Sequence, residues 1–193
     1  MNKEKLFRSF DKYLPLSEAE CADLGTRVME RRLKRKQYLL QEGEVCRQYY
    51  FVAEGCFRVF HIDSKGIEHN LQFVGEGDWI MEIDSFYEEK PSKVFVQANE
   101  PAVVLQLKKP DLLHLFVTNP KFDRNFRVIV ERRYVELENR MLQAISSSTE
   151  ERYLSFLKTY PKLANNIPNS QIASYLGITP EFLSKVRKKL AYK

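Results

Sequence analysis

The sequence predicts an α+β protein with an N-terminal antiparallel β-roll or sandwich, a long central helix and a C-terminal helix-turn-helix. Three observations support this fold class. Short runs rich in Val, Ile, Phe and Tyr recur between residues 36 and 107, with turn residues between them. An apolar stripe at helical spacing follows over residues 122–145. Residues 170–190 then combine two amphipathic stretches around a glycine.

The composition is that of a globular protein. The chain has 193 residues, 44% hydrophobic and 30% charged, which is enough for one or two domains with a buried core. No run of about 18 apolar residues is present, so we expect no membrane span. The first residues mix both charges without an apolar stretch, and three cysteines are too few for a disulfide framework. These features predict a cytoplasmic protein.

The N-terminal elements are two short helices followed by strands. The first helix is expected over residues 3–13, and the second begins near Ser17, where Ser17 and Glu20 have the spacing of a capping box. Residues 64–66 are expected to form a turn between two strands. The expected strands lie in the runs QYYFVAEG, CFRVFHIDSKG, IEHNLQFVGEGD, SKVFVQANEP and AVVLQL.

The apolar period lengthens after Pro110, and the stripe over residues 122–145 predicts one long helix of about 25 residues, or ~38 Å. A helix of this length that projects beyond a small roll needs a partner to cover its apolar face, so we predict a homodimer. The predicted domains are residues 1–118, the sensor roll with its flanking helices; 119–146, the dimerisation helix; and 147–193, the helix-turn-helix. The expected interface residues are Phe126, Val130, Tyr134, Leu137 and Met141.

The C-terminal segment carries the features of a helix-turn-helix. Ser148 or Thr149 can cap a helix after the serine-rich break at residues 146–149. Gly177 can adopt the left-handed conformation that ends a helix, and Thr179 and Pro180 suit the start of the next one. The small side chain of Ala173 allows close approach of the second helix.

The charge distribution indicates that this segment meets a polyanion. Residues 1–118 hold 17 Lys and Arg against 19 Asp and Glu, a net charge of −2, whereas residues 119–193 hold 14 against 7, a net charge of +7. A helix fits the major groove of duplex DNA, where lysine donates to guanine and glutamate accepts from cytosine. Arg187 and Lys193 add positive charge nearby. The predicted DNA-binding residues are Thr179, Glu181, Ser184, Lys185, Lys188 and Lys189.

The chain resembles the Crp/Fnr family of bacterial transcription regulators over nearly its whole length. The resemblance rests on the run QYYFVAEGCFRVFHIDSKGIEHNLQFVGEGDWI, the pairs Asn119-Pro120 and Arg132-Arg133, and the segment 172–190. It implies a double-stranded β-helix roll that senses a signal, pairing through the long helix, and a winged-helix-like domain that places two recognition helices on double-stranded DNA. RNA polymerase is then a candidate partner. Glu181 and Lys185 fall on base-contacting positions of the family, but Pro180 replaces its other contacting arginine.

The resemblance fails at the effector pocket. Cyclic-AMP-binding members carry a Gly-Glu pair whose glutamate bonds the ribose, and an Arg-Ser pair whose arginine neutralises the phosphate. Here the corresponding pairs are Met81-Glu82 and Ser92-Lys93, and Leu137-Glu138 stand where some members offer Thr and Ser to the adenine. Burying a phosphate without a paired cation is costly. We therefore expect an unknown small-molecule effector other than cyclic AMP.

Other function classes are weaker. The three histidines show no metal-ligand spacing, no phosphate-binding glycine loop is present, and the cysteines are not clustered as an iron–sulfur site requires, so we predict no enzyme activity, cofactor or metal. Cys46 and Cys56 are expected to be buried. Two alternatives remain open: a cyclic-nucleotide-responsive regulator in which Lys93 replaces the arginine, and a β-roll protein that does not bind DNA.

Overall fold

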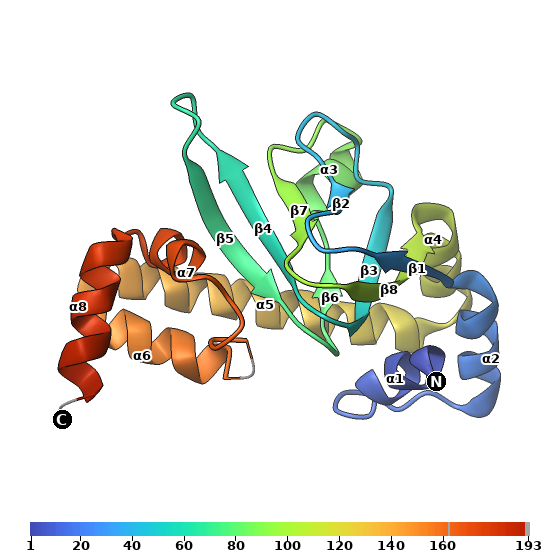
Figure 1. The fold of residues 1–193 in the computed structure, drawn as a ribbon. Coiled ribbons are helices and arrows are strands. Elements are labelled where there is room, and N and C mark those ends of the chain that lie inside the picture. Colours follow the sequence, from blue (N-terminus) through green and yellow to red (C-terminus); the bar gives the residue numbers. More distant parts are fainter. Residues whose placement is uncertain (162, 192–193) are drawn as a thin grey trace.

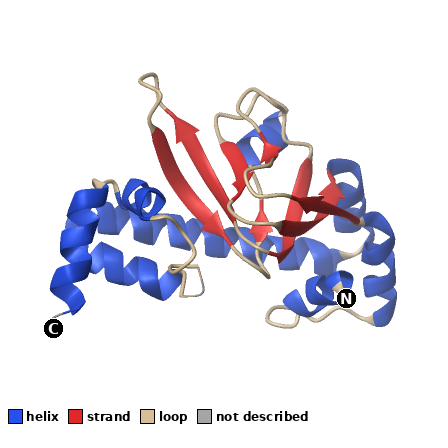
Figure 2. Ribbon diagram, in the orientation of Figure 1, coloured by secondary structure: helices blue, strands red, loops and turns tan. Residues whose placement is uncertain are grey.

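The computed structural model describes residues 1–161 and 163–191 and has the predicted α+β architecture (Figures 1 and 2). Two four-stranded sheets, in which every paired strand is antiparallel, form the roll. In spatial order, one sheet contains β1 (Met29–Leu33), β8 (Ala102–Lys108), β3 (Gln48–Glu54) and β6 (Trp79–Ile80). The other contains β2 (Tyr38–Leu40), β7 (Phe95–Ala98), β4 (Phe57–Ile62) and β5 (Glu68–Val74).

Helices flank the roll at both ends of the chain (Figure 1). The longest, α5, runs past the roll from the N-terminal helices to a helical domain at the C-terminus. None of the described helices is long and apolar enough to span a membrane. The helices are α1 (Asn2–Ser9), α2 (Glu18–Arg27), α3 (Ile83–Glu88), α4 (Lys109–Thr118), α5 (Pro120–Ser146), α6 (Thr149–Thr159), α7 (Asn169–Leu176) and α8 (Pro180–Ala191).

The core of the roll is aromatic and is closed by the first part of α5. The ring of Phe126 on α5 lies 4.9 Å from the ring of Trp79 and 6.1 Å from that of Phe10, so α1, β6 and α5 meet at one point. Phe126 is only 3% exposed and Phe122 is fully buried. The start of α5 is therefore part of the roll's own core.

The helical domain has a second core, which includes one residue of the roll. Phe73 on β5 is 1% exposed and packs among the rings of Phe156, Tyr160 and Tyr175 at 5.6–6.1 Å. Its side chain therefore anchors α6 and α7 against the edge of the second sheet.

The predicted runs correspond to β3, β4, β5, β7 and β8, and His61 pairs with His69 on either side of the predicted turn. The capping box at Ser17 and Glu20 is confirmed, and the cap after the serine-rich break is Ser148. Strands β1, β2 and β6 and helix α3 were not expected. Strand β1 is hidden in the sequence MERRL because four of its five residues are exposed at a sheet edge.

The wing implied by the resemblance is not met in the described residues. Between residues 109 and 191, apart from 162, the described chain is helical or irregular and holds no strand. The domain is therefore a three-helix unit whose remaining face packs on β5.

Candidate functional site

Helices α7 and α8 form a helix-turn-helix. Gly177 ends α7 in the left-handed region, with φ 66° and ψ 38°, where a residue without Cβ is favoured. The hydroxyl of Thr179 accepts from the backbone N–H of Phe182 at 3.2 Å and caps α8 as predicted. Ala173 and Leu183 are fully buried between the helices, while Phe182 is 47% exposed. The apolar sides of both helices thus face inward and fix the outward side of α8.

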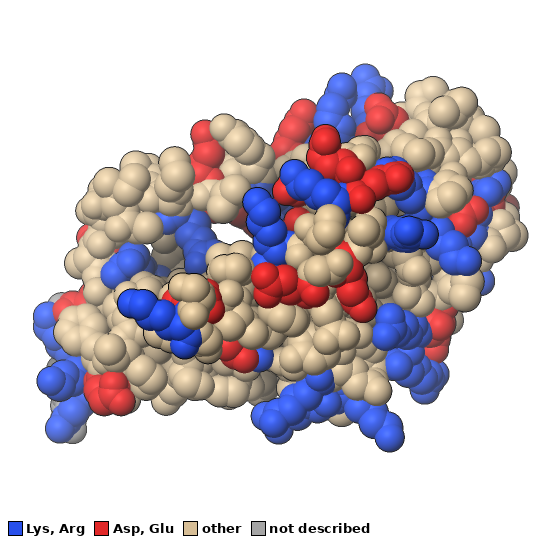
Figure 3. Space-filling view, turned by 90° about the horizontal axis from the view of Figure 1, so that it is seen from above, with Lys and Arg blue, Asp and Glu red and all other residues tan. Residues whose placement is uncertain are grey.

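All six predicted DNA-binding residues are exposed on the outward side of this unit. The carboxylate of Glu181 accepts from its own backbone N–H and from the Thr179 hydroxyl, which holds its pKa below the ordinary value. The Ser184 hydroxyl donates to the carbonyl of Pro180 at 3.0 Å, and Lys189 is paired with Glu150. Lys185 and Lys188 extend from the same face, and Figure 3 shows Lys and Arg side chains gathered at this end of the molecule.

Arg187 has a different role from the lysines around it. Its Nε donates to the Tyr153 hydroxyl at 2.8 Å and its Nη1 donates to Asn169 Oδ1 at 2.6 Å. This guanidinium therefore ties α8 to α6 and α7. Lys193 lies outside the described residues.

The predicted dimer residues divide into two groups along α5. Tyr134 is 61% exposed, and Leu137 and Met141 are each 63% exposed. Val130 is half-buried. Phe126, by contrast, is buried in the roll of its own chain, where its ring packs between those of Trp79 and Phe116. It was expected in the dimer interface, but its ring is not available to a second chain. The exposed apolar stripe instead continues through Val135, Leu142 and Ile145.

A pocket of about 420 Å³ lies between the roll and α5. Of the predicted effector residues, Met81, Glu82 and Leu137 line it. Further walls come from Val59 and Val94 of the roll and from Tyr160 and Tyr175 of the helical domain. Its walls are largely apolar and belong to both domains.

Three predicted pocket residues lie elsewhere. Ser92 is 3% exposed, but its hydroxyl is bonded to the backbone of Val94 at 3.1 Å, both as donor and as acceptor. Lys93 and Glu138 are exposed and do not line the pocket. Glu82 accepts from the backbone N–H of Ser85 at 2.7 Å and caps α3. Of the residues aligned with the nucleotide-binding pairs, Met81 and Leu137 thus line the pocket, Glu82 and Ser92 are bonded to nearby backbone, and Lys93 and Glu138 lie outside the pocket.

The polar side of α5 supplies wall residues that sequence reasoning missed. Arg133 Nη1 donates to Glu136 at 2.8 Å, and its Nη2 reaches the carbonyl of Trp79 at 3.4 Å. Arg140 donates to the carbonyls of Asn70 and Tyr175 at 3.2 and 3.1 Å, and also to that of Leu71. The steps of three and four from Arg133 to Glu136 to Arg140 place all three on one helical face, which was the available signal.

The three cysteines are free. Cys46 and Cys56 are each 2% exposed, as expected, and burial raises the pKa of Cys56 to about 12. Within residues 1–161 and 163–191, no group of three or more His, Cys, Asp and Glu side chains is placed to hold a metal ion.

Comparison with known proteins agrees with this arrangement. Residues 30–119 match the cyclic nucleotide-binding domain family. The cAMP-activated global transcriptional regulator CRP of Salmonella typhimurium is 23% identical over 135 residues, which cover 69% of this chain and 59% of that protein. These matches support the resemblance of the chain to the Crp/Fnr family of regulators. The aligned part spans less than two thirds of the Salmonella protein's length. The CRP protein of Escherichia coli is 21% identical over 168 residues, which cover 80% of this chain and 79% of that protein.

Solved structures of Crp/Fnr type share the fold. FixK2 from Bradyrhizobium japonicum superposes with a TM-score of 0.76 at 19% identity, covering 86% of this chain and 85% of its own. The c-di-GMP responsive global regulator CLP of Xanthomonas campestris superposes with a TM-score of 0.74 at 16% identity, covering 91% and 92%. At these identities the likeness concerns the fold.

Proposed function

We propose that this chain is a dimeric, sequence-specific DNA-binding transcription regulator of the Crp/Fnr type. The observation that carries the proposal is the α7–Gly177–α8 unit, whose buried side is apolar and whose outward side is basic. Lys185 and Lys188 are exposed there, three residues apart on one helix face. The helix-turn-helix geometry inserts the second helix into the major groove, where such side chains reach base edges and phosphates.

The C-terminal half of α5 is the proposed dimer interface. Its apolar side chains from Tyr134 to Ile145 are 51–79% exposed, a patch that a monomer rarely leaves open to water. A second copy of the same helix covers such a stripe with matching apolar side chains. Two recognition helices then face successive major grooves. RNA polymerase is a candidate partner of the DNA-bound dimer.

The effector is proposed to be a molecule other than cyclic AMP. A bound cyclic phosphate needs a cation, and serine is a weak replacement for arginine. Arg133 and Arg140 are the arginines that line the pocket between the roll and α5. The guanidinium of Arg133 already donates to Glu136, and that of Arg140 already donates to backbone carbonyls. Lys93 is exposed away from the pocket, which disfavours the alternative of a cyclic-nucleotide-responsive regulator.

DNA binding is tested by fluorescence anisotropy with operators selected from a random duplex library. Lys185→Ala is expected to weaken binding to the best operator by about 1–3 kcal/mol and to relax specificity at one base position. Lys188→Ala should weaken binding to all duplex sequences alike and reduce the salt dependence of the binding constant, because the variant loses a phosphate contact. Lys34→Ala, an exposed lysine of the roll, is the matched control. If no duplex binds even at low salt, the chain is instead a roll protein that does not bind DNA.

Cyclic-AMP binding is tested by isothermal titration of the purified protein. We expect no saturable heat at micromolar cyclic AMP or cyclic GMP. Two lost charge-assisted hydrogen bonds amount to roughly 3–6 kcal/mol, or two to four powers of ten in affinity. The double substitution Met81→Gly and Ser92→Arg should raise the affinity. Micromolar binding by the unmodified chain would contradict the proposal and make Lys93 the cation to substitute next.

A further inference from the structure

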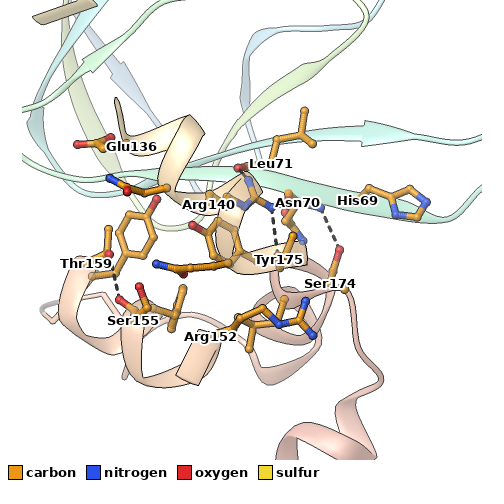
Figure 4. A pocket seen from close by; sticks show the side chains of 17 residues that line it. His69, Asn70, Leu71, Glu136, Arg140, Arg152, Ser155, Thr159, Ser174 and Tyr175 are labelled. Carbon is orange, nitrogen blue, oxygen red and sulfur yellow. Dashed lines mark hydrogen bonds between the residues drawn. The ribbon is translucent and has the colours of Figure 1, made fainter. Parts of the chain in front are cut away.

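The helical domain packs on the roll through α6 and α7, and α8 lies beyond them at the end of the molecule (Figure 1). A second cavity, of about 470 Å³, lies at this junction (Figure 4). In Figure 4, Asn70 and Arg140 lie on the side of the sheet, and Arg152 and Ser155 on the side of α6. No described residue of α8 lines this cavity. The exposed side of α8 is therefore not covered by the roll.

The polar side chains at the start of α8 are bonded within the helical domain. The Thr179 hydroxyl accepts from the backbone N–H of Phe182, and the Glu181 carboxylate accepts from that hydroxyl and from its own backbone N–H. The Ser184 hydroxyl donates to the carbonyl of Pro180 at 3.0 Å. These bonds hold the first turn of α8, and the backbone of Phe182 with it, in one conformation.

Phe182 projects from this fixed turn with its ring open to solvent. It is 47% exposed, whereas Leu183 and Val186 of the same helix are 0% and 5% exposed. Within the described residues, Phe182 belongs to neither of the two buried cores. The packing of the chain itself therefore does not account for an aromatic ring at this position, and burial of the ring in a complex is favourable.

The flank of α8 that carries Phe182 is also basic. Steps of three and four residues lead from Phe182 to Lys185 and Lys189, and all three side chains are exposed. Ammonium groups on this flank attract DNA phosphates, which brings the ring against the wall of the major groove. The edges of the base pairs in that groove are polar except for the 5-methyl group of thymine, on which a phenylalanine ring can pack.

We propose that Phe182 determines operator specificity by packing its ring on the 5-methyl group of a thymine. This inference rests on the proposed DNA-binding function and adds an apolar base contact to the polar contact expected of Lys185. Three residues of helix span about 4.5 Å, and one base pair spans about 3.4 Å of the duplex. The thymine is therefore expected within two base pairs of the base that Lys185 contacts.

Duplexes that differ by one methyl group test the proposal. In the operator selected for the unmodified chain, each thymine in turn is replaced by deoxyuridine, which keeps the hydrogen bonds of the base pair and removes only the 5-methyl group. Fluorescence anisotropy is expected to show about fourfold weaker binding after substitution at one thymine of a half-site, the effect of one buried methyl group. This series uses the unmodified protein, so it does not depend on the folding of a variant.

Phe182→Ala connects the thymine preference to the ring. At the sensitive position, this variant should bind the thymine and deoxyuridine duplexes with equal affinity. Leu154→Ala is the matched control, because Leu154 lies on α6 with a similar exposure of 49%, and it should keep the fourfold difference. Circular dichroism and thermal unfolding establish that both variants are folded. Low salt brings the affinity of a weakened variant into the measurable range.

The possible failures are distinguishable. Sequence-selective binding that no deoxyuridine substitution weakens would overturn this inference and leave the proposed function intact. The same holds for a fourfold difference that folded Phe182→Ala retains. If no duplex binds even at low salt, the proposed function fails, and the role of Phe182 fails with it.

Discussion

The two halves of α5 share one apolar spacing but have opposite surroundings. In the front half, Phe122, Phe126 and Ile129 are 0–6% exposed and close the core of the roll. In the rear half, Leu137, Met141 and Ile145 are 63–79% exposed. The comparison teaches that a helical stripe identifies a face, whereas the tertiary structure decides what covers it.

The rear half also has a polar side with its own use. Figure 1 shows α5 continuing beyond the roll to the helical domain. Glu136 and Arg140 line both cavities between the domains, and Arg133 lines the pocket between the roll and α5. One side of the rear half therefore joins two domains of one chain, and the other is the side that we propose to pack against a second chain.

The largest expected effect comes from a charge in the exposed stripe. Leu137→Asp places two carboxylates, one from each copy, in the proposed helix seam, at about 3–5 kcal/mol each. We expect a monomer at micromolar concentration by light scattering, with the circular dichroism of the roll retained. Asn139→Asp adds the same charge on the cavity side of α5 and should remain dimeric. A dimer that survives Leu137→Asp would show that the rear stripe is not the interface.

The next effect tests the buried half. In the Leu137→Asp background, which excludes the dimer contribution, Phe126→Ala should lower the free energy of unfolding by about 3–5 kcal/mol, because a ring packed against Trp79 leaves a cavity. Tyr134→Ala in the same background should change it by about 0.5 kcal/mol or less, since Tyr134 is 61% exposed. Urea unfolding measures both. Equal losses would remove the distinction between the two halves.

Local sequence features were sufficient for many elements. The capping boxes at Ser17 and Ser148 and the left-handed turn at Gly177 are decided by residues within one helical turn, and the structure has all three. The central strands were likewise predictable because their apolar runs are buried. Edge strand β1 was missed because three of its four exposed residues are charged.

The walls of the site depend on contacts between distant parts of the chain. Phe126 has the spacing of the predicted dimer stripe, but its ring packs in the roll against Trp79 and Phe10. Ser92 and Lys93 aligned with a phosphate-binding pair, but the backbone turns one inward to Val94 and the other to solvent. Asn70 and Arg152 meet at one cavity only because Phe73 docks the helical domain on β5. The spacing of residues along the sequence does not predict contacts between segments this far apart.

The smallest expected effect concerns the polar anchor at the front end of α5. Glu20 on α2 pairs with Lys121 at 2.8 Å and accepts from Asn119 Nδ2 at 2.8 Å. Burial alone raises its pKa, but these bonds and the backbone N–H of Ser17 outweigh burial and lower the pKa to about 2. Because the folded pKa is below the ordinary value of 4.5, Glu20 stabilises the fold above that value, and the contribution is lost as pH falls toward 2.

Glu20→Gln should therefore reduce the loss of stability between pH 6 and pH 3 by an amount on the order of 1 kcal/mol. Urea unfolding at intervals across this range measures the slope. Glu131→Gln, at an exposed carboxylate 3.8 Å from Arg127 on the same helix, is the control and should keep the slope of the unmodified chain, because exposed pairs contribute little. If Glu20→Gln keeps that slope too, the front end of α5 is fixed by Phe122 and Phe126 alone, and the contrast between its halves is purely one of apolar burial.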